Sequence, residues 1–353
     1  MTKRLTVYLF ASASIIFGSS SVLAQSSNAA LERFYRLQNA AGITDIPGEK
    51  ISFSSITPLT SKQLIAGEGE KVTVNAYLEL PEGATGPVPV VIILNCGDTV
   101  KTWKDIHYAK AMRKAGYATF LVNSFENRDT SANPRRALVQ LRHASAVDAF
   151  QALKTLAKDP RIDPKRIAVL GWANGGAVVL SAMIEELRAQ YVGGDLRFAA
   201  AVPIQAMCSI GSIGKSYSAT PILALHGARD DFMPASHCES LGKEIRAAGA
   251  NFNLAIYPDA GHQWDHEGFP LAFVQFAPSF KSCSYVTDFR VNQMVIGDKM
   301  VPFDDPNKSS MGSRHFHACA GGGTYWGYHE ATRTQAINDV VQFLATSFSA
   351  TNR

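Results

Sequence analysis

The sequence predicts an α/β domain in which a mostly parallel sheet is covered by helices on both faces. Two observations support this fold class. Short apolar runs, typical of buried strands, alternate along the chain with longer stretches of helical period. Their spacing is that of βαβ units, in which a helix connects two parallel strands. No internal repeat or linker divides the 353 residues, so we expect a single domain.

The strands are predicted from their apolar patterns. Residues 71–80 alternate between apolar and polar side chains, as in a strand with one buried face. Residues 90–94 are continuously apolar and largely β-branched, as in a fully buried strand. The same criteria give a series of strands at 50–57, 71–80, 90–94, 118–122, 167–171, 198–203, 222–225 and 253–257.

The helices are predicted between these strands. Residues 103–115 are amphipathic and stop at Gly116, and residues 134–158 contain no proline after the first position. The full series of helices is 30–39, 103–115, 134–158, 175–189, 235–248 and 332–348. Residues 263–327 break the alternation. They are rich in aromatic side chains and too many for a structureless loop, so we expect an ordered excursion there.

Composition narrows the class of partner. Hydrophobic residues make up 46% of the chain and charged residues 18%, which is typical of a globular protein with a large core. The formal net charge is +4, and it falls to +2 when Lys3 and Arg4 are removed. Since no run of basic residues is present either, we expect no nucleic-acid partner and no binding to a membrane surface by charge.

The first residues have the pattern of a secretory signal peptide. Lys3 and Arg4 precede an apolar stretch, Leu5 to Phe17, and small residues then lead to Ala24. The alternative is a membrane anchor, but the apolar run is shorter than the ~20 residues that span a bilayer. We therefore expect a signal peptide at 1–24, a mature domain at 25–353 without a membrane span, and a periplasmic or secreted location.

Five cysteines fit an oxidising compartment, and their odd number leaves at least one thiol unpaired within the chain. Cys208 and Cys238 follow consecutive strands at one edge of the predicted sheet, so we expect them to pair. Cys283 and Cys319 both lie in the excursion and form the second predicted disulfide. Cys96 is then the unpaired thiol.

The strongest local signal is the run Gly171-Trp172-Ala173-Asn174-Gly175. A buried strand enters a tight turn with a glycine two positions on either side of Ala173, and a helix follows. This is the framework of a nucleophile elbow, G-x-S-x-G, with the serine replaced by alanine. The alternative is an ordinary glycine-rich turn between a strand and a helix.

Two residues downstream favour the elbow. Asp230 follows the strand at 222–225, and His262 follows the strand at 253–257. Nucleophile, acid and histidine is the chain order of the triad in α/β-hydrolases, and an acid that orients an imidazole is the arrangement a general base needs. Taken alone, Asp230 is explained as a turn residue and His262 as a surface histidine. Their order in the chain and their positions at strand ends together favour a catalytic site. Asp231 is the alternative acid.

The chain resembles the dienelactone hydrolase family of α/β-hydrolases over roughly residues 72–348. The resemblance lies in four stretches: ATFLVNSFENR (118–128), RHASAVDAF through RIDPKRIAVLGWANGG (142–176), PILALHGARDDFMP (221–234) and IYPDAGHQW (256–264). It implies the α/β-hydrolase fold, with Asp230 as the triad acid and His262 as the general base. Members of the family carry cysteine or serine where this chain has Ala173.

The remaining site residues are assigned around this triad. We expect the oxyanion hole to use the main-chain N–H of Asn174, which follows the nucleophile position, and that of Cys96, in the turn after the strand at 90–94. Cys96 lies on the oxyanion side rather than on the elbow, so we expect a structural thiol and not a second nucleophile. Arg128 matches an arginine of the family, and it either contacts an anionic substrate group or braces its loop.

Aromatic residues and a possible metal site complete the predictions. Trp264 is expected to line the substrate pocket, together with Tyr325 and Trp172, although Trp172 also fits core packing. His315, His317 and Cys319 have the ligand types that zinc or copper prefers. Without further ligands in the sequence, a disulfide at Cys319 explains this run better, and we expect neither a metal nor another cofactor.

Three functional hypotheses follow. The first is a hydrolase of carboxylic esters or lactones with a Ser(Cys)-His-Asp mechanism, here lacking the nucleophile at Ala173. The second is a naturally non-catalytic protein of the same fold that binds a ligand or partner. The third is an active enzyme in which His262 activates a bound water. Because a binding protein has no chemical need for both Asp230 and His262, the first is favoured. The sequence does not indicate the oligomeric state.

Overall fold

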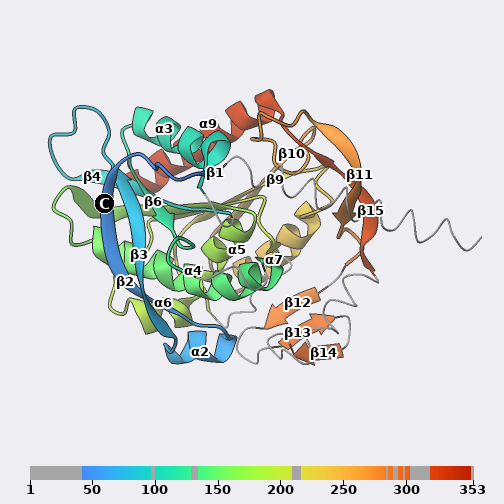
Figure 1. The fold of residues 1–353 in the computed structure, drawn as a ribbon, viewed down its shortest axis with the longest axis horizontal. Helices are drawn as coiled ribbons and strands as arrows, with labels where there is room; N and C mark the ends of the chain where they lie inside the picture. The colour runs from blue at the N-terminus through green and yellow to red at the C-terminus, as the bar shows by residue number, and fades with distance from the viewer. Residues whose placement is uncertain are drawn as a thin grey trace, which may run out of the picture. The chain divides into compact units, whose positions relative to one another are not determined.

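A mostly parallel sheet lies at the centre of the chain (Figure 1). The computed structural model describes residues 42–96, 100–128, 134–208, 216–283, 285–288, 293–296, 299–302 and 319–350. Within these residues the sheet has eight strands in the order β10-β9-β8-β7-β4-β6-β3-β2. The strands are β2 (Glu49–Thr57), β3 (Glu70–Glu79), β4 (Val88–Leu94), β6 (Ala118–Asn123), β7 (Ile162–Trp172), β8 (Ala200–Ile204), β9 (Ile222–Gly227) and β10 (Phe252–Tyr257).

The strands from β10 to β6 run parallel to one another, and β3 and β2 are antiparallel additions at one edge. The carboxyl ends of the parallel strands therefore meet at one edge of the sheet, which is where ligands bind in open α/β sheets. The predicted strands agree with the observed ones to within a few residues. Strand β7 is the exception, since it begins at Ile162 rather than at residue 167.

Helices cover both faces of the sheet (Figure 1). One core contains α3 (His107–Lys114) and α9 (Glu330–Ala350). The other contains α2 (Ser61–Ala66), α4 (Pro134–Leu156), α5 (Asn174–Ser181), α6 (Glu185–Tyr191) and α7 (Ala235–Ala247). Strand β4 contributes to both cores, with Val91 and Ile93 in the first and Ile92 and Leu94 in the second. The predicted fold class is thus confirmed.

Two predicted helices differ from the structure. The stretch 175–189 forms α5 and α6, because Ile184 leaves the helical path and forms an isolated bridge with Tyr217. No glycine or proline lies near this break, so the sequence carried no signal for it. The stretch 103–115 begins with a π-helical segment, η1 (Thr102–Ile106), before α3.

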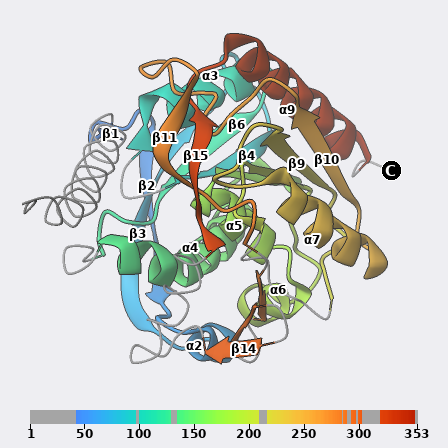
Figure 2. The same cartoon turned by 90° about the vertical axis from the view of Figure 1, so that its right-hand side faces the viewer.

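The segment after His262 contains strands that pair with one another rather than with the central sheet. Strand β11 (Ala272–Ser279) runs antiparallel to β15 (Gly321–Trp326), and the two lie side by side in Figure 2. Strands β12 (Tyr285–Asp288), β13 (Gln293–Ile296) and β14 (Lys299–Pro302) form a small antiparallel sheet. A further short pair joins β1 (Gly42–Ile43) to β5 (Val100–Lys101).

Both predicted disulfides are confirmed. Cys208 and Cys238 are bonded with their Cα atoms 4.9 Å apart, and Cys283 is bonded to Cys319 with a Cα separation of 5.1 Å. Cys96 is in no disulfide, as expected. These two covalent links tie the segment after β8 to α7 and the end of β11 to the start of β15.

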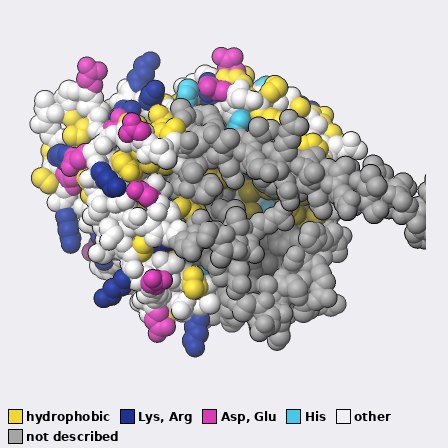
Figure 3. Space-filling model, viewed as in Figure 1, with side chains coloured by type: hydrophobic (Ala, Val, Ile, Leu, Met, Phe, Trp, Pro, Cys, Tyr) yellow, Lys and Arg dark blue, Asp and Glu magenta, His cyan; other side chains and the backbone are white. Residues whose placement is uncertain are grey.

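Acidic and basic side chains are interspersed over the described part of the face in Figure 3. None of the helices in the described ranges is both long and apolar enough to cross a bilayer. The chain divides into a unit at Met1–Ala40 and a larger unit at Ala41–Arg353. The predicted signal peptide at 1–24 and the helix at 30–39 lie outside the described residues, so the start of the domain at residue 25 stays a prediction.

Candidate active site

Ala173 occupies a strained turn between β7 and α5. Its backbone angles are φ 49° and ψ −109°, a conformation that residues with a side chain rarely adopt. The turn is close-packed: a Cβ added at Gly171 would lie 2.6 Å from the carbonyl oxygen of Gly175, and one at Gly175 would lie 2.8 Å from that of Leu94. Glycine is therefore required on both sides of Ala173, as the elbow framework predicts.

Asp230 and His262 form a buried pair. Oδ2 of Asp230 lies 2.6 Å from Nδ1 of His262, and each residue is 1% exposed. The other carboxylate oxygen, Oδ1, accepts a hydrogen bond from the main-chain N–H of Met233 at 2.8 Å. With both oxygens engaged, the carboxylate is fixed in orientation. It holds the imidazole with Nε2 facing away from the acid.

Asp231, the alternative acid, is engaged elsewhere. Its main-chain N–H donates to Oγ1 of Thr324 at 2.9 Å, and its carboxylate lies 3.3 Å from Nζ of Lys281. Both partners belong to the segment after His262. The geometry therefore favours Asp230 over Asp231 as the partner of the histidine.

Strand β15 and Gly327, the residue after it, hold the main chain of His262 on both sides. The N–H of His262 donates to the carbonyl of Tyr325, and the N–H of Gly327 donates to the carbonyl of His262, each at 2.8 Å. The imidazole packs edge-on against Trp326, with ring centroids 4.4 Å apart, and against Phe232 at 4.9 Å. Within the described residues, Nε2 of His262 makes no hydrogen bond. It remains open to a reacting group.

Sequence reasoning missed Trp326 and Phe232. The only signal for Trp326 was the aromatic richness of residues 263–327, which does not say which ring reaches the histidine. Tyr325, which was expected in the pocket, instead packs against Phe273 and carries the guanidinium of Arg229 3.3 Å from its ring centroid.

The two predicted oxyanion donors lie next to each other in the fold. Asn174 is the first residue of α5, and Cys96 follows β4. The close approach of Gly175 to the main chain of Leu94 and Asn95 brings the start of α5 against the end of β4. The amides of Asn174 and Cys96 are thus on the segments that flank Ala173, with Cys96 half-buried.

Arg128 is a structural brace. Its guanidinium forms two hydrogen bonds with the carboxylate of Asp148, at 2.7 and 2.9 Å, and the side chain is 4% exposed. The remaining N–H groups donate to Oγ1 of Thr57 and to the main-chain carbonyls of Ser124 and Ile56. A guanidinium has five N–H donors, and all five are used here. Of the two alternatives for Arg128, the geometry supports the bracing of its loop.

Trp264 and Trp172 both lie in the core beneath α3 and α9. Each is at most 1% exposed; Trp264 packs edge-on against Tyr257, and Trp172 packs edge-on against Tyr108. Trp264 was expected to line the pocket. Its full burial among core side chains instead gives it a packing role, which position along the chain could not reveal.

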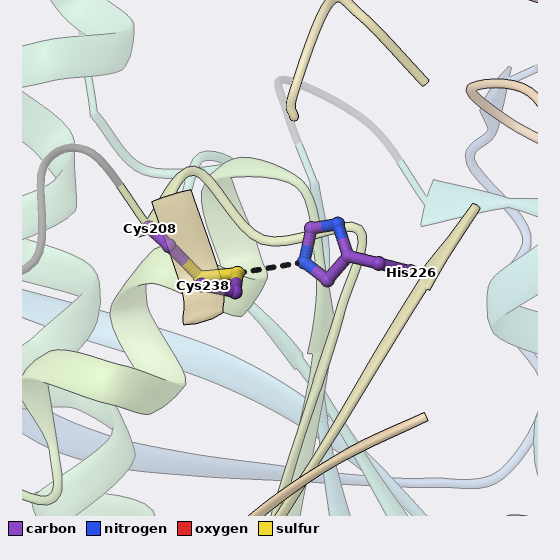
Figure 4. A group of neighbouring side chains, drawn as sticks. All are labelled: Cys208, His226 and Cys238. Atoms are coloured by element: carbon purple, nitrogen blue, oxygen red, sulfur yellow. Dashed lines mark hydrogen bonds between the residues drawn. A yellow bond between two sulfur atoms is a disulfide. The ribbon is translucent and has the colours of Figure 1, made fainter. Parts of the chain in front are cut away.

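The side chains of Cys208, His226 and Cys238 lie close together (Figure 4), and His226 is next to the last residue of β9. Nε2 of His226 lies 2.9 Å from Sγ of Cys238 and accepts a hydrogen bond from the N–H of Ala206. Burial lowers the pKa of His226 to about 4, so the ring is neutral at pH 7. These are metal-ligand types, but the disulfide removes both thiolates from coordination.

The predicted run of two histidines and a cysteine gives no metal site in the described residues. His315 and His317 lie outside the described ranges. Cys319 is bonded to Cys283, so its sulfur is not a thiolate ligand. The disulfide explanation of this run is therefore supported at Cys319.

Comparison with known proteins identifies the family of the chain. The model of the dienelactone hydrolase family matches residues 74–275, which is more than half of the chain. The chain belongs to the dienelactone hydrolase family. The match spans β4, the elbow and the Asp230–His262 pair, and it ends within β11. This member of the family therefore carries a hydrolase scaffold.

Individual relatives of this dienelactone hydrolase family member are distant. A Yersinia pestis protein provisionally named a carboxymethylenebutenolidase is 25% identical over 226 residues, which cover 57% of this chain and 77% of that protein. Among solved structures, a provisionally named dienelactone hydrolase from Klebsiella pneumoniae is 19% identical, with 62% and 89% of the two chains covered and a TM-score of 0.42. The butyrate-bound esterase 2 of Thermogutta terrifontis is 13% identical, with 55% and 81% covered and a TM-score of 0.44.

Proposed function

We propose that this scaffold hydrolyses carboxylic esters or lactones through a nucleophile at position 173, and that the chain with Ala173 binds the substrate without completing the reaction. The observation that carries the proposal is the buried pair of Asp230 and His262, joined at 2.6 Å. A carboxylate and an imidazole so arranged form a general base, and burying both of them serves no evident purpose in packing alone.

With serine at position 173, the reaction would follow the triad mechanism. The hydroxyl oxygen attacks the ester carbonyl while Nε2 of His262 takes its proton, and Asp230 stabilises the resulting imidazolium. The main-chain N–H groups of Asn174 and Cys96 would receive the negative charge on the carbonyl oxygen. His262 then returns the proton to the leaving alcohol, and a water molecule hydrolyses the acyl-enzyme by the reverse steps.

Ala173 interrupts the first of these steps only. The methyl group supplies no nucleophile, whereas the strained turn, the base and the oxyanion donors do not depend on the missing hydroxyl. In a comparable triad, loss of the serine lowers turnover on the order of a million-fold. Restoring a hydroxyl at this position should therefore produce a large gain.

The test compares three purified proteins against short aryl esters: the parent chain, Ala173→Ser, and Ala173→Ser/His262→Ala. We expect hydrolysis with Ala173→Ser only, and a weaker or more selective activity with Ala173→Cys, since a thiolate needs the same base. If all of them fold and remain at background, the hydrolase proposal fails.

The second candidate is a non-catalytic binding protein that uses the same site. The observation that favours it is Ala173 itself, which leaves the chain without the usual nucleophile of the family. Saturable binding of an ester to the parent chain, combined with an inactive Ala173→Ser variant, would support this candidate. Under either proposal the partner is a small molecule, and the two disulfides are compatible with a periplasmic or secreted location.

A further inference from the structure

Three residues other than glycine have a positive φ among the described residues: Ala173 (49°), Gln205 (48°) and Gln263 (55°). Ala173 follows β7, Gln205 follows β8, and Gln263 follows His262. Each such conformation costs about 1–3 kcal/mol and persists where the surroundings enforce it, commonly at functional sites. The positive φ at Ala173 is explained by the tight turn of the nucleophile elbow. The positive φ at Gln205 needs another explanation.

Gln205 lies between the elbow and the histidine. Strand β8 is the neighbour of β7 on one side and of β9 on the other. The carbonyl of Ile204, immediately before Gln205, accepts a hydrogen bond from the N–H of Ala173 at 2.9 Å. On the other side, Oε1 of Gln205 accepts from the N–H of Gln263 at 3.0 Å. Two consecutive residues, Ile204 and Gln205, thus connect the nucleophile position to the residue that follows the base.

The hydrogen bond from Gln263 fixes the orientation of the Gln205 amide. Because Oε1 faces an N–H donor, Nε2 must occupy the other position of the planar carboxamide. Nε2 is fully buried and has no hydrogen-bond partner in the described part of the chain, and the residue is 1% exposed. A buried donor left unsatisfied costs about 1–3 kcal/mol, so Nε2 needs an explanation, and a bound ligand or an ordered water would supply its partner.

We propose that Gln205 is a specificity-determining residue whose Nε2 donates a hydrogen bond to a neutral oxygen of the substrate other than the scissile carbonyl. This inference rests on the proposed esterase function. The carbonyl oxygen itself is received by the main-chain donors at Asn174 and Cys96. The oxygen bound by Gln205 therefore belongs to a second polar group, in the acyl or the alcohol part of the ester.

The donor, Nε2 of Gln205, belongs to an uncharged amide. Its neighbours at the candidate site are also buried, since Ala173 is 5% exposed and His262 is 1% exposed. A single neutral donor does not compensate for removing a carboxylate from water, but it does satisfy an ether, hydroxyl or keto oxygen. Arg128, the cation that the family resemblance associated with the substrate, is fully occupied by its own partners. The substrate class is thus a neutral oxygenated ester rather than an anionic one.

The test uses two pairs of esters that differ only in the replacement of a CH₂ by oxygen. p-Nitrophenyl butyrate and methoxyacetate vary the acyl part, and butyl and 2-methoxyethyl acetate vary the alcohol part. Values of kcat/KM are compared between Ala173→Ser and Ala173→Ser/Gln205→Glu. Glutamate keeps the oxygen that accepts from Gln263 and has nearly the same shape. Once ionised it replaces the donor with a second acceptor, so the assay is run at a pH above the pKa that burial raises.

We expect the substitution to lower kcat/KM for the oxygenated member of one pair about tenfold more than for its hydrocarbon partner, since one hydrogen bond is lost. A general effect on folding or on His262 would change both members alike and cancel in the ratio. If the ratio is the same in both proteins for both pairs, as it would be if Nε2 held only a water, the proposal is overturned.

Two further measurements keep the outcome decisive. If the glutamate variant does not fold, Gln205→Met removes the donor in a side chain of similar length, and the same ratio applies. If Ala173→Ser is inactive, the dissociation constants of butyl and 2-methoxyethyl acetate are measured on the parent chain and on Gln205→Met. A preference for the oxygenated ester that the methionine removes supports Gln205 even though the hydrolase proposal has failed, and no such preference overturns it.

Discussion

Nδ1 of His262 lies 2.6 Å from Oδ2 of Asp230, and Oδ1 of the same carboxylate is held by the N–H of Met233. In this arrangement the acid fixes both the tautomer and the direction of the imidazole. The amide of an asparagine in its place would present either a donor or an acceptor, without the charge that stabilises an imidazolium.

In the Ala173→Ser background, Asp230→Asn should lower kcat about 10⁴-fold, with a much smaller change in KM, because the loss falls on the transition state. Asp231→Asn is the matched control. Since Asp231 pairs with Lys281 and not with His262, its substitution should leave kcat within a few-fold of the background. Equal losses in the two variants would show that the acid has been assigned wrongly.

The backbone strain at Ala173 predicts an unusual effect of glycine. Ala173→Gly should raise the free energy of unfolding by about 1 kcal/mol, because glycine adopts a positive φ without steric cost. Gly175→Ala should lower it by about 1–3 kcal/mol, since the new Cβ would lie 2.8 Å from the carbonyl oxygen of Leu94. Urea unfolding of both variants and the parent provides the comparison. A destabilised Ala173→Gly protein would contradict the assignment of strain.

Arg128→Met should reduce stability and leave substrate binding unchanged. Removal of the guanidinium leaves the Asp148 carboxylate buried and uncompensated, which typically costs about 3–5 kcal/mol. The double variant Arg128→Met/Asp148→Leu should recover part of this loss, because it removes the orphaned charge. The midpoint of urea unfolding and the KM of the Ala173→Ser form report the two effects separately. A raised KM with unchanged stability would return Arg128 to the substrate site.

The burial of Asp265 should make the free energy of unfolding depend on pH. Its burial raises the pKa to about 7, although the hydroxyl of Tyr108 donates to Oδ1 at 3.0 Å and acts in the opposite direction. In the unfolded chain the pKa is about 3.9. Between these values the folded chain keeps a proton that the unfolded chain releases. This group alone therefore lowers the free energy of unfolding by about 1.4 kcal/mol per pH unit as the pH rises.

Asp265→Asn removes that contribution. Relative to the parent, the variant should become more stable by about 2 kcal/mol between pH 5 and pH 7.5, because folding of the parent requires the ionised Asp265 of the unfolded chain to take up a proton, which becomes harder as the pH rises. His226, with its pKa lowered to about 4, gives the opposite slope between pH 4 and 6.5 and is present in both proteins, so it cancels. A stability difference that does not vary with pH would show that Asp265 is ionised throughout.

The parts of the fold that the sequence predicted correctly, and the side chains that the structure brings together at the candidate site, are those with a local signal. Continuous apolar runs identified strands such as β4, and the two glycines around Ala173 identified the tight turn. Asp230 and His262 were found because each follows a strand in a fixed chain order. Both disulfides followed from the strand order and the excursion.

Features that depend on contacts between distant segments were missed. Nothing in the residues around Gln205 distinguishes a strained glutamine from an ordinary one, because its hydrogen bonds go to Leu225 and Gln263, which are distant in the sequence. Trp264 and Trp326 are equally aromatic in the sequence, yet one lies in the core and the other against His262. From the sequence, Arg128 could either contact an anionic substrate group or brace its loop. Only its contact with Asp148 on α4 favours the second explanation.

The covalent link between Cys283 and Cys319 has a consequence for proteolysis. It brackets residues 284–318 and joins the end of β11 to the start of β15, the strand that together with Gly327 holds His262 from both sides. A protease that cleaves within the bracketed residues would produce two fragments that stay joined as one molecule, with the support of the base intact.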